Sequence, residues 1–242
     1  MELASRVALV TGGGRRVGQA LALALARRGM DLAIHYNSAA DGARETAAAA
    51  RALGCRAELF PANLEDATAA KALPAEVAAR FGRLDVLVNS AGIMPQATVE
   101  ETTPELWDHT MAVNLRSAFF TVQGALPWLR AAGGKVVNLA DVGGLEPWPR
   151  YTAHCVSKAG VVMLTKTLAV ALAPDITVNA IAPGAVLPPD DWSDAAREHL
   201  AKTTPLRRLG SPADVAGALV YLLEADYVTG EVLVVDGGRL IR

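Results

Sequence analysis

The chain has 242 residues, of which 52% are hydrophobic and 5% are aromatic, and its formal net charge is -2. This length fits one large α/β domain, and the small net charge argues against a nucleic-acid surface or a polybasic membrane patch. Two cysteines, Cys55 and Cys155, are too few for a disulfide framework, and no metal-ligand spacing joins them to the four histidines.

The first apolar run is too short for a signal peptide, and no uncharged apolar stretch approaches the roughly 18 residues of a spanning helix. We therefore expect a soluble, cytoplasmic protein that acts on a small molecule, without nucleic acid, membrane or metal.

Short apolar runs rich in β-branched residues alternate with helical patterns along the chain. The runs that predict strands are 7–10, 32–35, 57–60, 86–88, 135–139, 176–180 and 231–235. The patterns that predict helices are 16–28, 40–53, 67–81, 104–129, 151–172 and 212–224. This alternation predicts one α/β domain over residues 1–242, with a doubly wound parallel sheet of about seven strands and helices on both faces. The Pro-rich segment 184–209 follows a strand, where a substrate lid would lie.

A glycine-rich turn joins the first predicted strand to an Ala/Leu-rich helix. Thr11 and Gly12 end the strand, Arg16 and Val17 begin the helix, and Gly18 follows. Unpaired N–H groups and the dipole of a helix N-terminus both favour an anion, so this segment predicts a pyrophosphate site.

The second predicted strand ends in His35, Tyr36, Asn37 and Ser38, with no Asp or Glu to accept a hydrogen bond from a ribose 2′-hydroxyl. An arginine such as Arg16, together with these polar residues, fits a 2′-phosphate instead. An ordinary surface role for Arg16 is less attractive, because a cation at a helix N-terminus opposes the dipole. The segment therefore predicts NADPH/NADP+ rather than NADH.

A third segment carries the candidate chemistry. Thirteen positions separate Asp141 from His154, and four more lead to Lys158, so His154 and Lys158 share one helix face. Where the fold brings Asp141 beside this pair, its carboxylate favours a charged imidazole at His154 and Lys158 opposes it, which leaves a group able to exchange protons near neutral pH.

The ordered motifs resemble the short-chain dehydrogenase/reductase family over essentially the whole chain. They are T-G-x-x-x-G-x-G at 11–18, N-S-A-G at 89–92, Asn114, the Asp141–His154–Lys158 segment, N-x-x-x-P-G at 179–184 and D-G-G at 236–238. The resemblance implies a Rossmann-type fold, catalytic roles for Asp141, His154, Lys158 and Asn114, and a nicotinamide cofactor. The implied cofactor contacts are Thr11, Gly12, Arg16, Val17, Gly18, His35, Tyr36, Asn37, Ser38, Asn63, Leu64, Asn89, Ser90, Ala91, Gly92, Lys158, Pro183 and Gly184.

Three residues depart from the family pattern. Asp141 and Arg16, together with the strand end at 35–38, resemble the pteridine reductases, whereas His154 differs from these enzymes as well. Asp141 stands where the family usually has Ser, Arg16 stands at the middle Gly, and His154 stands where the family has its catalytic Tyr. An imine nitrogen can take its proton from a weak donor, whereas a ketone needs a stronger one, so the first expectation is reduction of a pterin-like or other C=N substrate. The residues expected to line the substrate pocket are Met94, Trp148, Tyr151 and Trp192, and Tyr151 is also a possible substitute donor.

Two alternatives stay open. One is an NADPH-dependent carbonyl reductase, acting on a ketone, quinone or oxoacyl group with His154 as the acid. The other is a catalytically impaired cofactor-binding protein, against which the retained Lys158 and Asn114 argue. The helical patterns 104–129 and 151–172 are apolar on more than one face, and related proteins pair such helices, so we expect a homotetramer, with a dimer as the alternative.

Overall fold

Seven parallel strands form one sheet in the order β3-β2-β1-β4-β5-β6-β7 in a computed structural model that describes residues 1–187 and 193–241. The strands are β1 (Val7–Thr11), β2 (Asp31–Tyr36), β3 (Ala57–Pro61), β4 (Val86–Asn89), β5 (Lys135–Leu139), β6 (Thr177–Pro183) and β7 (Val232–Val235). The predicted Rossmann-type doubly wound fold is confirmed. Strands β2 and β3 lie on one side of β1, and β4 to β7 lie on the other, so the strand order switches between β1 and β4. In open α/β sheets a ligand crevice forms at such a switch point, beyond the carboxyl ends of the strands.

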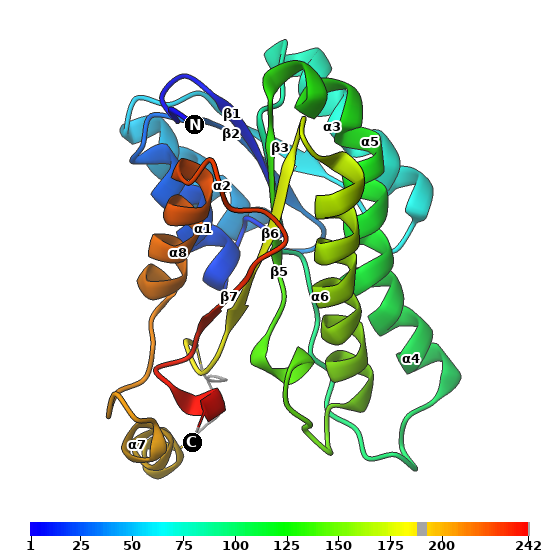
Figure 1. Cartoon of the computed structure of the whole chain (residues 1–242), viewed down its shortest axis with the longest axis vertical. Helices are drawn as coiled ribbons and strands as arrows, with labels where there is room; N and C mark the ends of the chain where they lie inside the picture. The colour runs from blue at the N-terminus through cyan, green and yellow to red at the C-terminus, as the bar shows by residue number, and fades with distance from the viewer. Residues whose placement is uncertain (188–192, 242) are drawn as a thin grey trace.

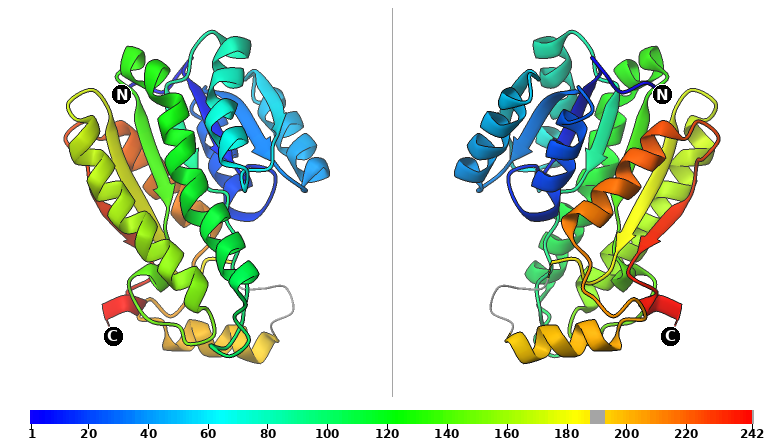
Figure 2. Two further views of the ribbon diagram at one scale, coloured as in Figure 1. Left: turned by 90° about the vertical axis from the view of Figure 1, so that its right-hand side faces the viewer. Right: turned by 90° about the vertical axis from the view of Figure 1, so that its left-hand side faces the viewer.

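Helices cover both faces of the sheet (Figures 1 and 2). One face carries α1 (Arg16–Ala26), α2 (Ala40–Ala52) and α8 (Pro212–Glu224), and the other carries α3 (Ala67–Phe81), α5 (Ser117–Ala132) and α6 (Thr152–Leu172). Most strand residues are apolar, and the inner strands β1, β4 and β5 are buried along their whole length. Small residues allow close packing: a Cβ on Gly124 of α5 would lie 2.0 Å from the carbonyl oxygen of Lys71 in α3.

Two helical segments differ from the sequence prediction. The single helix expected over 104–129 is α4 (Pro104–Met111), a π-helical turn at Ala112–Arg116, and then α5. A further helix, α7 (Asp194–Thr203), lies within the segment expected to be irregular; Ser193 caps it by accepting a hydrogen bond from the amide of Ala196. Of the α7 residues only Leu200 is buried, so the sequence carries little helical periodicity there.

Helix α6 is long and apolar enough to cross a membrane by length and composition, although it contains Lys158 and Lys166. It packs against β6 and the turn after β5, and the core helix of a soluble protein passes the same test. We treat α6 as a core helix of the domain.

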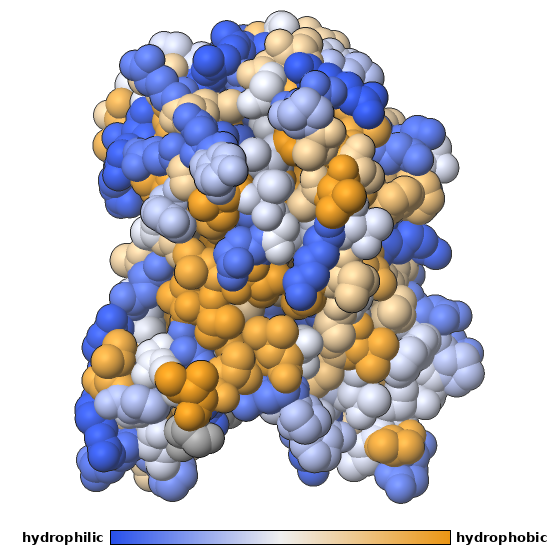
Figure 3. Space-filling model, viewed as in Figure 1, coloured by the Kyte–Doolittle hydropathy of each residue, from blue (hydrophilic) through white to orange (hydrophobic). Residues whose placement is uncertain are grey.

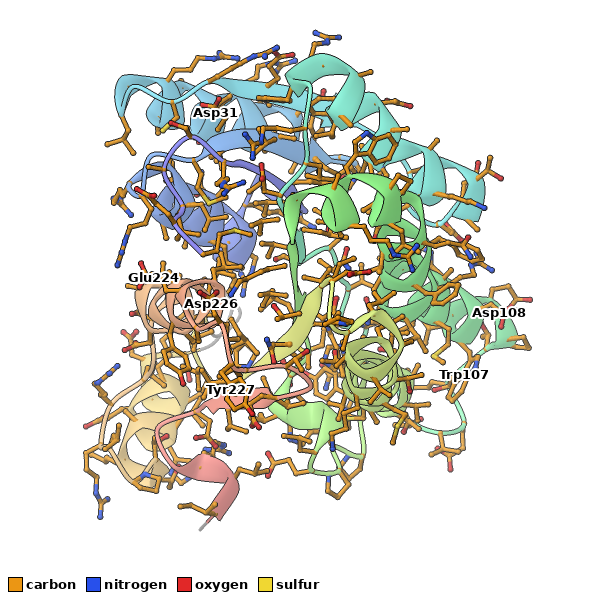
Figure 4. The ribbon with its side chains drawn as sticks, turned by 45° about the horizontal axis from the view of Figure 1, so that its top comes forward. Asp31, Trp107, Asp108, Glu224, Asp226 and Tyr227 are labelled. Carbon is orange, nitrogen blue, oxygen red and sulfur yellow. The ribbon has the colours of Figure 1, made fainter. Side chains whose placement is uncertain are left out.

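Charged residues pair with one another at the edge of the sheet where the strands begin. Lys135, which is buried, donates to the carbonyl oxygen of Ala225 and to the carboxylate of Asp226, and the terminal amine of Met1 also pairs with Asp226. The hydrogen bond from Lys135 lowers the pKa of Asp226 to about 2. Figure 4 shows Glu224 and Asp226 together at the end of α8. These charges are paired within the fold, Asp226 with Lys135 and the terminal amine, and Glu224 with Arg28.

Candidate active site

A pocket of about 910 Å³ opens at the carboxyl edge of the sheet, beside the ends of β4, β5 and β6. The carboxyl edge of the sheet faces downwards in Figure 1. Figure 3 shows a notch in the surface there, between α7 and the lower end of α6. The expected site residues that line the pocket are Arg16, Val17, Ser90, Gly92, Met94, Asp141, Trp148, Tyr151, His154, Lys158, Pro183 and Gly184. Sites for small ligands have this size and this position in open α/β sheets.

The turn between β1 and α1 is built to hold an anion. Gly12 has φ +66°, and a Cβ on Gly18 would lie 2.2 Å from the carbonyl oxygen of Gly12. Helix α1 has no side-chain N-cap and no acidic residue in its first turn. Its N-terminal amides therefore have no capping side chain, and an N-terminus of this kind fits an anion such as a pyrophosphate.

Thr11 ties this turn to the end of β4. Its Oγ accepts hydrogen bonds from the amides of Ser90 (3.0 Å) and Ala91 (3.1 Å). Next to them, Asn89 is buried, and its amide donates to the Oδ1 of Asn138. Thr11 and Asn89 thus position the backbone that borders the pocket. Their side chains make these hydrogen bonds within the protein.

His35 supports the same turn from beneath. Its Nδ1 accepts a hydrogen bond from the amide of Gly12 at 3.1 Å, and its Nε2 lies 3.0 Å from the carbonyl oxygen of Ala62, to which it donates. Burial lowers the pKa of His35 to about 4, partly opposed by the Ala62 hydrogen bond, so the ring is neutral at pH 7. The side chain is 2% exposed. This placement corrects the expectation that His35 itself contacts the cofactor.

The end of β2 and the residues after β3 lie side by side, as the amide of Ala62 donates to the carbonyl oxygen of Tyr36. Asn37 and Ser38 are exposed, Leu64 is buried, and Asn63 uses its Oδ1 to accept the amide of Glu65. These residues border the pyrophosphate turn on the side away from the pocket, where the adenosine half of a dinucleotide would lie.

Arg16 takes a different direction from the one expected. Its φ is +52°, in the left-handed region that favours glycine, and its guanidinium donates to the carbonyl oxygen of Leu187 at 2.7 Å. Leu187 follows β6, and β6 and β2 lie on opposite sides of β1. The guanidinium therefore points away from Asn37 and Ser38, which corrects the expectation that it grips a 2′-phosphate beside them.

Asn114 links three parts of the site. It lies in the π-helical turn, donates to the carbonyl oxygen of Ile93 at 2.9 Å and to the Oγ of Ser157 at 2.9 Å, and accepts the amide of Ile93 at 2.8 Å. π-Helical turns often occur at functional sites. Here the turn holds the loop after β4 against α6. Gly92, the residue before Ile93, packs closely on the same side chain, since a Cβ there would lie 3.3 Å from the Oδ1 of Asn114.

Lys158 lies at the inner end of the pocket. Its Nζ donates to the carbonyl oxygen of Leu139 at 2.6 Å, and the side chain is 7% exposed. Burial lowers the pKa of Lys158 to about 8, and Asp141 partly opposes this shift. The ammonium is thus charged at pH 7, but it loses its proton more readily than an ordinary lysine.

Asp141 and His154 face each other across the pocket wall. The Oδ1 of Asp141 lies 3.9 Å from the Nε2 of His154 and accepts the amide of Gly143 at 2.7 Å, which caps the short helix Val142–Gly144. The Nδ1 of His154 lies 3.1 Å from the carbonyl oxygen of Ile93, and its Nε2 has no hydrogen bond within residues 1–187 and 193–241. The expected trio of Asp141, His154 and Lys158 is therefore brought together.

Aromatic side chains form one side of this wall. The rings of Trp148 and His154 are stacked with centroids 6.3 Å apart, and Tyr151 meets Trp148 edge-on at 6.0 Å. Met94 is 44% exposed at the pocket. Trp192, the remaining expected substrate contact, lies outside the described residues, as does part of the expected lid segment 184–209.

Several contributors were absent from the sequence prediction. Ile93 acts through its backbone amide and carbonyl, which no side-chain pattern reveals. Ser157 lies directly before Lys158 and is buried, and its Oγ donates to the carbonyl oxygen of His154. His109 and Arg239 also line the pocket, and they lie shortly before Asn114 and directly after the D-G-G motif.

The chain resembles known proteins over nearly its full length. A family model described as enoyl-(acyl carrier protein) reductase matches residues 13–239. The 3-oxoacyl-[acyl-carrier-protein] reductase FabG of Staphylococcus aureus (strain Mu50) is 37% identical over 97% of this chain and 98% of its own length. A mutant short-chain dehydrogenase/reductase from Serratia marcescens superposes with a TM-score of 0.92, 32% identity, and coverage of 99% of this chain and 100% of its own. Acetoin dehydrogenase from Enterobacter cloacae gives a TM-score of 0.89, 35% identity, and coverage of 98% and 96%.

Proposed function

Because this chain belongs to the short-chain dehydrogenase/reductase family, we propose that it is an NADPH-dependent carbonyl reductase. The observation that carries the proposal is the meeting of Asp141, His154 and Lys158 at the wall of a pocket that adjoins a pyrophosphate-type turn. A bound nicotinamide cofactor supplies or takes the hydride. The chain's own residues hold the cofactor, orient the carbonyl and move the proton.

Lys158 and Asn114 have positioning roles in this proposal. The buried Lys158 ammonium, held by the carbonyl oxygen of Leu139, lies where it can meet the nicotinamide ribose and place a positive field beside the reacting oxygen. Asn114 fixes the Ile93 loop that holds the ring of His154. His154 lines the same pocket and is 4% exposed, and in this proposal its ring exchanges the substrate proton.

Relatives favour a carbonyl over a pterin. The names of two of them concern a 3-oxoacyl group and acetoin, both of which carry oxygen at the reacting carbon. The pterin-like C=N substrate that Asp141 suggested from the sequence receives no support from these comparisons, so an oxoacyl or small ketone substrate becomes the main proposal. We expect Trp148, Tyr151 and Met94 to contact it.

The preference for NADPH rests on the end of β2. Asn37 and Ser38 are exposed there and can donate to a 2′-phosphate, and neither is a carboxylate that would repel one. Arg15, the N-cap residue of α1, is exposed and offers a cation near the phosphates, in place of the Arg16 side chain. A catalytic efficiency with NADH equal to or above that with NADPH would contradict this assignment.

A substrate panel tests the function. Oxidation of NADPH is followed with an acetoacetyl thioester, a quinone, diacetyl, dihydrobiopterin and dihydrofolate. We expect turnover with at least one of the carbonyl compounds and none with the pterins. Turnover of the pterins alone contradicts the proposal. Tight NADPH binding without any turnover identifies the remaining alternative, a cofactor-binding protein.

Assembly and location extend the proposal. Val156, Met163 and Val170 recur every seven residues on α6 and are 42%, 61% and 83% exposed. A second copy of the chain would bury this apolar row, so we propose a homotetramer, with a dimer as the alternative. A cytoplasmic location stays a prediction.

A further inference from the structure

Asp141 places a negative charge in the wall of the pocket. It is the one carboxylate among the described residues that line the pocket, and its side chain is 22% exposed. An ionised carboxylate accepts hydrogen bonds and donates none. A substrate atom that makes a favourable polar contact with Asp141 must therefore carry a hydrogen.

The fold holds this carboxylate in one position. Asp141 is the N-cap of the short helix Val142–Gly144, and its Oδ1 accepts the amide of Gly143 at 2.7 Å. A Cβ on Gly143 would lie 3.2 Å from Oδ1, so the glycine lets the carboxylate lie against the backbone. The other oxygen, Oδ2, has no hydrogen bond to residues 1–187 or 193–241. The anchored group thus keeps one oxygen that has no donor within the described protein.

The neighbouring nitrogen groups do not hydrogen-bond to this carboxylate. The Nε2 of His154 lies 3.9 Å from Oδ1, which is beyond hydrogen-bond distance, and the ammonium of Lys158 donates to the carbonyl oxygen of Leu139. Burial lowers the pKa of Lys158 and Asp141 partly opposes this effect, so the two charges interact. Asp141 is therefore screened by a nearby positive charge but is still able to accept a hydrogen bond.

The same negative charge limits how a ketone can lie in the pocket. Reduction places negative charge on the carbonyl oxygen, and a carboxylate beside that oxygen would oppose it. The reacting oxygen must therefore point toward a donor such as Lys158, and another part of the substrate must meet Asp141. In the proposed function His154 exchanges the substrate proton, and it lies 3.9 Å from Asp141. The group that meets Asp141 should accordingly lie on a carbon next to the carbonyl.

The charges of the pocket favour a neutral donor over a cationic one. The described lining residues include Arg15, Arg16 and Lys158, so positive side chains outnumber the single carboxylate. A substrate ammonium would be attracted by Asp141 but repelled by these cations, whereas a hydroxyl group can donate to Asp141 without a charge of its own. A hydroxyl is therefore the donor that fits this pocket.

We propose that the substrate is a ketone with a hydroxyl group on the carbon next to the carbonyl, and that Asp141 selects it by accepting a hydrogen bond from this hydroxyl. The inference rests on the proposed function and narrows it to α-hydroxyketones. In the reaction the carbonyl carbon gains a hydride from NADPH and its oxygen gains a proton, so C=O becomes C–O–H. The neighbouring hydroxyl keeps both of its bonds, and the product is a vicinal diol.

Three small ketones test this selection. Hydroxyacetone has a hydroxyl that donates, butanone carries a methyl group in the same place, and methoxyacetone keeps the electron-withdrawing oxygen but has no hydrogen to donate. We expect kcat/KM with NADPH to be about tenfold or more higher for hydroxyacetone, the effect of a hydrogen bond to a charged group. A value no higher than that of butanone or methoxyacetone overturns the inference, although turnover of these ketones still supports the proposed function. Absence of turnover with every ketone overturns both.

Variants at Asp141 show whether its carboxylate is responsible. Asp141→Ser keeps a residue that can cap the helix Val142–Gly144, and its hydroxyl can donate to a carbonyl oxygen. It should lower the preference for hydroxyacetone over butanone about fivefold or more, and Asp141→Asn, which accepts without a charge, should lower it in the same direction.

The matched control is Glu146→Gln. It removes a carboxylate from the same loop and keeps an acceptor for the indole of Trp148, so the preference should stay unchanged. An undiminished preference in Asp141→Ser overturns the inference, because another group then selects the substrate. If Asp141→Ser has no activity, the same ratio in Asp141→Asn decides.

Discussion

Replacing His35 with Asn should remove the part of the acid sensitivity of folding that comes from its buried neutral ring. The neutral His35 ring joins the pyrophosphate turn to the end of β3, through hydrogen bonds with Gly12 and Ala62. Burial lowers its pKa to about 4 in the folded protein, compared with 6.5 for a free imidazole. Between these values the unfolded chain binds a proton that the folded protein refuses, so stability falls as the pH falls.

The size of the effect follows from the two pKa values. The full contribution is present above pH 6.5 and is lost as the pH falls through about 4. A difference of about 2.5 pH units, at about 1.36 kcal/mol each, corresponds to about 3 kcal/mol. By pH 5 the loss from this group should already reach about 2 kcal/mol. Below pH 4, His35 should contribute no further loss, because it is then protonated in both states.

Urea unfolding at pH 7 and pH 5, at one protein concentration, measures this contribution. Asn can supply both an acceptor and a donor but does not titrate. The variant should therefore lose about 2 kcal/mol less than the wild type between the two pH values, whatever its stability at pH 7. His199→Asn, at an exposed histidine of α7, is the matched control and should follow the wild type. Equal losses in the wild type and His35→Asn would show that His35 is not a buried neutral group.

Three further predictions concern the cofactor, the buried lysine and assembly. Gly18→Ala should weaken NADPH binding at least tenfold by calorimetry, because its Cβ would lie 2.2 Å from the Gly12 carbonyl oxygen; unchanged affinity would contradict the assigned turn. Lys158→Met should lower kcat at least 100-fold, and in the wild type the pKa of Lys158, lowered by burial to about 8, should add a loss of reduction above that pH; the reasoning fails if Lys158→Met retains this alkaline loss. Met163→Glu with Val170→Glu should dissociate the assembly in light scattering, and a monomeric wild type would refute the proposed oligomer.

The fold was largely predictable because its signals are local and repeated. Buried parallel strands show as short apolar runs, and each of the seven predicted runs corresponds to a strand of the sheet. The π-helical turn at Ala112–Arg116 was not predictable, because its residues suit an α-helix equally well. Helix α7 was missed because it presents little apolar surface to the core and therefore has weak periodicity.

The site was predictable as a set of residues but not as a set of contacts. The order of the motifs predicted that Asp141, His154 and Lys158 lie in one site, and in the structure the three residues line one pocket. The direction of Arg16 depends on a carbonyl group 171 residues away, and the orientation of His154 depends on the carbonyl of Ile93. Backbone acceptors that come from distant segments leave no mark in a side-chain pattern.

The π-helical turn at Ala112–Arg116 also constrains the length of the segment between α4 and α5. Each residue of an α-helix turns the chain by about 100°, and a π-helical turn takes about one residue more for the same rotation, so α4 and α5 keep nearly the same faces on its two sides. Deleting one residue there would restore regular α-helical geometry and leave His109 in the pocket wall, whereas Asn114, inside the turn, would lose its alignment with Ile93. The extra residue thus serves the site and not the packing of the two helices, and the length of this segment should tolerate change less well than its composition.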